Sequence, residues 1–150
     1  MHFYCTGFIE MKKHRSMITN FDNTFFTPEM LKQEWWRSAE RLKSLLYAGW
    51  TLEEIWSLSN YIYESPFAYF LYPGTSLGKL LISKPVNGKL DYSKTLHVIP
   101  DVMNNNINLK YCVYKDGDIL NQEILWHYEC AENNLNDKFN EFINWNKHWK

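Results

Sequence analysis

The sequence lacks a charge excess of either sign and has few cysteines. Lys and Arg number 16 and Asp and Glu number 17, which leaves a formal net charge of -1. Proteins that bind nucleic acid or anionic lipid through their overall field carry a positive excess, so this balance disfavours both kinds of partner. The 3 cysteines, Cys5, Cys112 and Cys130, match no zinc or redox spacing. We expect them to be reduced thiols of a cytoplasmic protein.

Long apolar runs and catalytic motifs are absent as well. The densest apolar run, residues 66–72, is much shorter than a membrane span and is flanked by Glu64 and Gly74. In residues 1–15 the basic run follows the apolar stretch, which is the reverse of a secretory signal. The sequence contains no phosphate-binding loop and no dinucleotide-binding, zinc-protease, nucleophile-elbow or C-x-x-C motif. We therefore expect no catalytic residue, no cofactor, no bound metal and no membrane segment.

Apolar and aromatic residues, in contrast, are plentiful. Hydrophobic residues make up 45% of the chain and aromatic residues 17%, with 7 Trp among them. At 150 residues the chain can bury a substantial core without disulfides. We expect residues 1–150 to form a single α+β domain. So many rings should leave some of them half-exposed at a surface or an interface.

Residues 27–65 carry start and stop signals for two helices. Thr27 is expected to cap the first helix, and Gly49 to end it. Between them, apolar residues at three- and four-residue steps mark one helix face: Leu31, Trp35, Ala39, Leu42, Leu45 and Leu46. Thr51 and Glu54 fit the pattern of a capping box at the start of the second helix. The stretch predicts a helical hairpin.

Turn signals after the helices predict the first of two β-hairpins. The Pro-Gly pair at 73–74 predicts a turn. Asn87-Gly88 is the dipeptide that best supports a type I′ turn. It would join two strands, residues 79–86 and 89–100.

A second hairpin is expected where apolar and mixed residues alternate after the asparagine run. A two-residue turn at 116–117 would place Leu109 opposite Ile124. The apolar residues of both strands would then share one face. The same register places Cys112 and Cys130 on opposite faces, which argues against a disulfide between them.

The last segment, residues 131–150, is predicted to form an amphipathic helix docked on the sheet. The residues at helical steps are Leu135, Phe139, Phe142, Ile143 and Trp149. Together the segments predict an α+β fold in which an antiparallel sheet of two hairpins packs against a helical hairpin and a C-terminal helix. The alternative for the last helix is an apolar face held open for a partner helix.

Two groups of titratable residues suggest chemistry, but each has a simpler explanation. Glu53 and Glu54 suit the N-terminal dipole and the cap of a helix. In an extended strand His127 and Glu129 share one face, whereas Cys130 points to the other. A cysteine nucleophile with a histidine base is therefore not expected there, and the sequence disfavours an enzyme.

Two other functions stay open at this point. A small-ligand-binding or enzymatic α+β domain would use an aromatic pocket with a histidine as its polar group. The residues for such a pocket would be Phe67, Tyr69, Tyr72 and Trp126, with His97 or His127. A structural accessory protein would instead dimerise through an exposed hairpin edge. The sequence leaves the oligomeric state undecided.

Two asparagine-rich segments, NNNIN at residues 104–108 and ENNLND at residues 132–137, lie in this small, aromatic-rich chain. With the lack of catalytic motifs, these features resemble bacterial immunity proteins of the kind found in contact-dependent growth inhibition systems. The resemblance implies a cognate protein toxin domain as the partner, often a nuclease. It also implies a steric mechanism, in which the protein covers the active site or substrate groove of the toxin.

Acidic and aromatic residues near helix and hairpin ends form the predicted partner-binding surface. They are Glu53, Glu54 and Trp56 on the second helix, and Asp116 and Asp118 at the hairpin tip. Acidic groups suit a basic nuclease surface through electrostatic steering, and aromatic anchors supply a desolvated centre. The alternative for each residue is ordinary solvated capping and turn chemistry.

Overall fold

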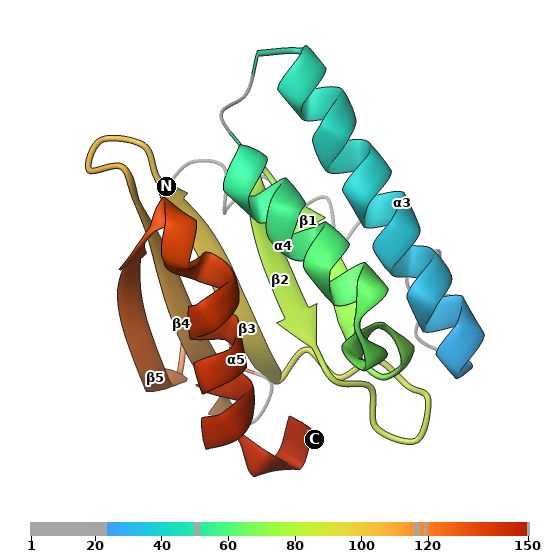
Figure 1. Cartoon of the computed structure of the whole chain (residues 1–150). Coiled ribbons are helices and arrows are strands. Elements are labelled where there is room, and N and C mark those ends of the chain that lie inside the picture. Colours follow the sequence, from blue (N-terminus) through green and yellow to red (C-terminus); the bar gives the residue numbers. More distant parts are fainter. Residues whose placement is uncertain (1–23, 50–51, 116–117, 119, 150) are drawn as a thin grey trace.

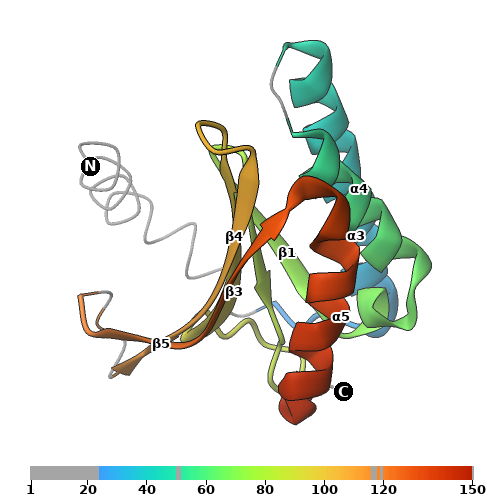
Figure 2. The same ribbon diagram turned by 60° about the vertical axis from the view of Figure 1, so that its left-hand side comes forward.

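The computed structural model describes residues 24–49, 52–115, 118 and 120–149. Within them the fold is α+β, with α-helices lying on one face of a five-stranded antiparallel sheet (Figures 1 and 2). The α-helices are α3 (Pro28–Tyr47), α4 (Glu53–Glu64) and α5 (Leu135–Trp145). The strands are β1 (Tyr72–Ser76), β2 (Lys79–Ser83), β3 (Lys94–Asp101), β4 (Asn106–Tyr114) and β5 (Gln122–Ala131). Three-residue and four-residue 3-10 turns complete the chain: η1 (Pro66–Tyr69), η3 (Glu132–Asn134) and η4 (Lys147–Trp149).

The sheet is a meander in which each strand pairs with the next, in the order β1-β2-β3-β4-β5. The predicted α+β class, the helical hairpin and the C-terminal helix are confirmed. The prediction of two hairpins missed a strand, because Pro73 and Gly74 lie in β1 and do not form a turn. An edge strand tolerates a proline, whose missing N–H can face away from the ladder. The turn comes later, at Leu77 and Gly78, which have φ angles of 49° and 78°.

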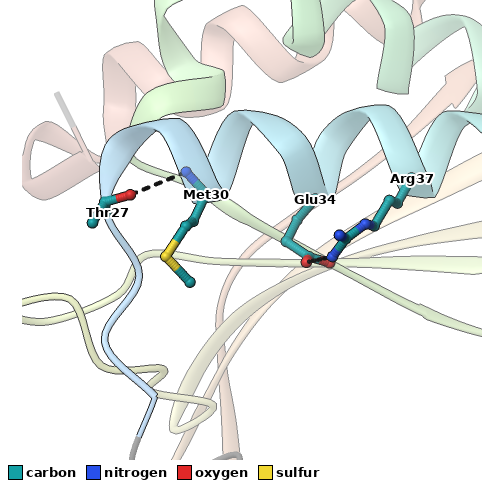
Figure 3. Close-up of polar contacts among 4 residues, drawn as sticks. All are labelled: Thr27, Met30, Glu34 and Arg37. Carbon is teal, nitrogen blue, oxygen red and sulfur yellow. Dashed lines mark hydrogen bonds and ion pairs between the residues drawn. The ribbon is translucent and has the colours of Figure 1, made fainter.

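Helix α3 begins and ends where its sequence signals predict. The Thr27 hydroxyl accepts a hydrogen bond of 3.2 Å from the Met30 N–H, and Glu34 and Arg37 form an ion pair of 2.7 Å along the solvent side (Figure 3). Gly49 follows the helix with a φ of 97°, a value that suits glycine. The face turned to the core buries Leu31, Trp35, Ser38, Ala39 and Leu42.

Helix α4 starts at Glu53, and its N-cap position is occupied by Leu52, which has no side-chain hydrogen bond to the helix. The predicted cap was Thr51, one residue earlier, and Thr51 lies outside the described residues. The first turn is therefore stabilised by the acidic groups of Glu53 and Glu54 beside the helix N-terminus. The buried face carries Ile55, Leu58, Ser59 and Ile62.

The turn at Asn87-Gly88 exists, but it does not join long strands. Asn87 and Gly88 have φ angles of 53° and 78°, as a type I′ turn requires. They close only an isolated bridge between Val86 and Lys89. The predicted strands 79–86 and 89–100 are therefore too long, since β2 ends at Ser83 and residues 84–93 form a loop.

The register between β4 and β5 differs from the predicted one by four residues. Leu109 lies opposite Tyr128 and not opposite Ile124. Two features cause the shift: the loop between the strands spans residues 115–121, and a bulge interrupts the pairing at Tyr111 and Cys112. Because the shift at Leu109 is an even number of residues, Tyr128 lies on the face of the sheet that the helices cover. The bulge places Ile124 on the opposite face.

The cysteines of the sheet do not pair. Cys112 lies opposite Thr95, and Cys130 lies opposite Ile107. These pairings place the two thiols on opposite faces of the sheet, as predicted, and both are free. Cys5 lies outside the described residues.

The core lies between the sheet and the helices, with α4 between α3 and α5 (Figure 1). Helix α5 docks on the sheet as predicted, so its apolar face is not held open for a partner. Its buried residues, Leu135, Phe139, Phe142 and Ile143, are joined by Trp149 of η4. Phe142 is the centre of an aromatic cluster, with ring centroids 5.1 Å from Tyr111, 5.2 Å from Trp126 and 5.1 Å from Trp149.

Two glycines with positive φ should respond differently to alanine. We expect Gly49→Ala to lower the free energy of unfolding by about 1 kcal/mol, because of its φ of 97° alone. Gly88→Ala should cost about 1–2 kcal/mol. A Cβ at Gly88 would lie 3.3 Å from both Phe25 Cδ1 and the Phe26 carbonyl oxygen. Urea denaturation measures both values, and equal losses would show that these contacts do not limit the turn.

Candidate functional site

Three of the predicted partner-binding residues come together at one end of the helical pair. Glu53, Glu54 and Trp56 line a hollow of about 430 Å³. Figure 1 shows the end of the helical pair at which α3 ends and α4 begins. The other residues around this hollow are Lys43, Leu46, Tyr47 and Ser57. We call this surface the α3–α4 corner. Two carboxylates against one ammonium group give it a net negative charge.

Local backbone hydrogen bonds hold the end of α3 at the corner. The Ala48 N–H bonds to the carbonyls of Ser44 and Leu45, each at 3.1 Å, and the Gly49 N–H bonds to the Leu46 carbonyl at 3.0 Å. These bonds satisfy carbonyl groups that the helix end would otherwise leave unpaired. The end of α3 and the start of α4 both contribute side chains to the same hollow.

The corner combines an exposed ring with a supported one. Tyr47 has 81% of its surface exposed, which is rare for a large ring. Trp56 is half-buried and packs against the core. Glu53 is exposed on the same side. A half-buried ring, an exposed ring and acidic groups around one hollow suit contact with a basic protein surface, where Tyr and Trp are the usual anchors.

The remaining two predicted residues do not join the corner. Asp118 lies in the turn between β4 and β5, far from the start of α4 (Figures 1 and 2). Its Oδ1 accepts a hydrogen bond of 2.9 Å from the Leu120 N–H, which is ordinary turn chemistry. Asp116 lies outside the described residues. The five predicted residues therefore do not form one continuous surface.

Sequence reasoning missed the residues that α3 contributes, above all Tyr47. The partner-binding surface was predicted from acidic residues near helix and hairpin ends, and the last turn of α3 contains no acidic residue. A usable signal was present, because a large ring just before Ala48-Gly49 must lie at a helix end. Lys43 comes one turn earlier on the same side of the helix and lines the same hollow.

Comparison with known proteins gives no relative. No protein-family model, curated protein or solved structure matches this chain. Within the described residues, no group of three or more His, Cys, Asp and Glu side chains is arranged to hold a metal ion. None of the described helices is both long and apolar enough to cross a bilayer. Any function must therefore be argued from the geometry of the site itself.

The residues of the predicted aromatic pocket are not neighbours. Tyr72 lies on β1 and Trp126 lies on β5, at opposite edges of the sheet. Phe67 packs into the core, with its ring centroid 5.6 Å from that of Phe139. Tyr69 is exposed on η1. One pocket lined by all four rings is therefore excluded, because the meander separates the two edge strands.

The side chains of His127, Glu129 and Cys130 are arranged as the strand geometry predicts. His127 lies opposite Lys110 on the face away from the helices, whereas Cys130 is buried on the helix side. Burial raises the pKa of the Cys130 thiol, which makes it a poor nucleophile at neutral pH. His127 instead approaches the Asn108 amide oxygen, at 3.3 Å from its Nε2. These residues do not form a nucleophile and base pair.

His97 offers a pH test of the sheet. Burial lowers its pKa below the ordinary value of 6.5, and Lys79 and Lys110 lower it further. The unfolded chain therefore binds more protons than the folded chain below about pH 6.5, so the free energy of unfolding should fall as the pH drops. Urea denaturation at about pH 7.5 and about pH 5.5 should show a smaller loss for His97→Gln than for wild type.

The matched control for this test is His127→Gln, which removes an exposed histidine from the same face of the sheet. It should retain the pH dependence of the wild type. An unchanged pH dependence in His97→Gln would show that another group causes the loss of stability.

Proposed function

We propose that this chain is a non-catalytic protein-binding module of the bacterial cytoplasm, an immunity protein that neutralises a cognate toxin domain. The toxin would be a basic enzyme such as a nuclease, and the protein would cover its active site or substrate groove. The observation that carries the proposal is the α3–α4 corner, where Glu53, Tyr47 and Trp56 surround one hollow.

The physical support is the combination of charge and aromatic surface. Nucleases bind a polyanion, so their substrate grooves are basic, and acidic groups on a blocking protein accelerate encounter with such a groove. Exposed aromatic rings then supply contact area at little cost in side-chain entropy. The last turn of α3 is held by backbone hydrogen bonds, so this side of the hollow requires little ordering of its backbone on binding.

Co-expression tests the proposal directly. The tagged full chain is expressed together with the product of the adjacent upstream gene and purified through the tag. We expect one stoichiometric partner that is toxic to cells on its own, and whose enzymatic activity is lost when the purified chain is added. A partner that stays active in the complex, or cells that are not protected from it, would overturn the immunity function.

The dimerising accessory protein has one observation in its favour. Within the described residues, strand β5 is an edge of the sheet, and Ile124, Leu125 and Tyr128 are each more than 40% exposed on it. Exposed, apolar edge strands are sites of strand pairing between chains. Sedimentation of the purified chain separates the two functions, because the accessory protein requires a dimer in the absence of any toxin.

A further inference from the structure

A second hollow, of about 410 Å³, lies between the loop of residues 84–93 and the C-terminal turn η4. This loop and η4 lie at the end of the molecule away from the α3–α4 corner (Figures 1 and 2). Tyr111 of β4 and Trp149 of η4 contribute to its wall, and both are nearly fully buried. Two buried aromatic residues therefore form part of its lining.

The charges around this hollow are mostly positive, although the whole chain carries a net charge of -1. Among the described residues that line it, Lys84 and Lys94 are basic and Asp91 alone is acidic. The Asp91 Oδ1 accepts hydrogen bonds from the Ser93 N–H at 3.0 Å and from the Ser93 hydroxyl at 2.5 Å. These hydrogen bonds partly compensate the negative charge of Asp91, so the two lysines give the hollow a net positive charge.

Both walls are held in place by the fold. Lys84 Nζ donates a hydrogen bond to the His148 carbonyl oxygen, which ties the loop to η4. The bridge between Val86 and Lys89 closes the loop on itself, with hydrogen bonds of 2.8 and 3.0 Å. The Phe26 N–H also bonds to the Gly88 carbonyl at 2.8 Å. Because these contacts already order the hollow, little conformational entropy should be lost when a ligand binds.

We propose that this basic hollow binds a small organic anion, a molecule with a phosphate or carboxylate group beside an apolar group. Lys84 and Lys94 supply ammonium groups for the anion, and Asn87 supplies an amide beside them. Pro85 and Val86 form an apolar part of the wall. A hollow of about 410 Å³ is in the size range of small-molecule sites.

The proposal is independent of the toxin-binding function, since it uses none of the residues of the α3–α4 corner. Phenyl phosphate is the probe, and two-dimensional ¹H–¹⁵N NMR of the full chain is the measurement. We expect saturable shifts of the amide signals of residues 84–94 and 147–149. Benzoate in place of phenyl phosphate shows whether a carboxylate is also accepted, and phenol tests the need for a charge. Affinity should fall as salt is added.

Lysine variants test whether the charged residues of the hollow bind phenyl phosphate. Lys94→Gln removes an exposed charge and should weaken phenyl phosphate binding about fivefold, and Lys84→Gln should weaken it at least as much. Lys43→Gln, which changes a lysine of the α3–α4 corner, should leave the affinity unchanged. The proposal is wrong if about 10 mM phenyl phosphate shifts none of these amides. It is equally wrong if phenol shifts them as strongly, or if Lys94→Gln binds as well as wild type.

Discussion

Replacing Trp35 by alanine is expected to lower the free energy of unfolding by about 3–5 kcal/mol. Trp35 has 0% of its surface exposed, and its Nε1 donates a hydrogen bond of 2.8 Å to the Leu71 carbonyl oxygen. Alanine would leave a large cavity under α3 and a buried carbonyl without this donor. The bond also joins α3 to the chain just before β1, so it holds the helix against the edge of the sheet.

The neighbouring residue Trp36 is the matched control. It has 47% of its surface exposed, and Trp36→Ala should cost less than about 1 kcal/mol. Trp35→Phe keeps most of the ring and loses the hydrogen bond, so it should fall between the two, at about 2 kcal/mol. Urea denaturation followed by circular dichroism measures all three. Equal costs for Trp35→Ala and Trp36→Ala would contradict the orientation of α3.

The tryptophan pair shows which parts of the fold are readable from sequence. The spacing of apolar residues in α3 selects Trp35 for the core and leaves Trp36 outside, because a helix fixes the angle between successive side chains. The same local rule finds the buried face of α5. The sequence of a segment is therefore enough to predict that it forms a helix and which of its faces is buried.

Pairing between strands needs more than the segment itself. The register of Leu109 depends on the length of the loop after β4 and on a bulge at Tyr111, and neither leaves a clear local pattern. Strand β1 was missed because Pro73 and Gly74 favour a turn in isolation. In the folded chain their position at a sheet edge overrides that preference.

The candidate site also combines residues that local sequence predicts with a residue that only the fold brings to them. Glu53, Glu54 and Trp56 were predictable, since they lie within one turn at a helix start. Tyr47 belongs to the preceding helix, and only the meeting of α3 and α4 brings it to the same hollow. Asp118 was grouped with them because it is an acidic residue near a hairpin end, but the chain places it between β4 and β5 and not at this hollow.

Changes at the α3–α4 corner should have the largest effect on partner binding. Tyr47→Ala removes a ring with 81% of its surface exposed, and Glu53→Lys reverses an exposed charge. We expect each to weaken binding of the co-purified toxin domain about tenfold, and the double variant to weaken it about 100-fold. Calorimetry measures the affinity. Growth of cells that express the toxin measures the loss of protection.

Each of these variants has a control of the same kind. Tyr69→Ala removes another ring that is more than 40% exposed, on η1. Glu29→Lys reverses an acidic residue in the first turn of α3, as Glu53→Lys does in α4, so the cost to the helix dipole is similar. Both controls should bind the toxin domain within about threefold of wild type, a difference below 1 kcal/mol.

The association rate gives a second, independent reading of the corner. If acidic steering contributes, Glu53→Lys should slow association and reduce its dependence on salt, whereas Tyr47→Ala should mainly speed dissociation. Tyr47→Ala should alter stability by about 0.5 kcal/mol or less, and Glu53→Lys should lower it by about 1 kcal/mol through the helix dipole, so both variants should remain folded. Wild-type affinity in the double variant would place the interface elsewhere, and the exposed edge at β5 would then be the next surface to change.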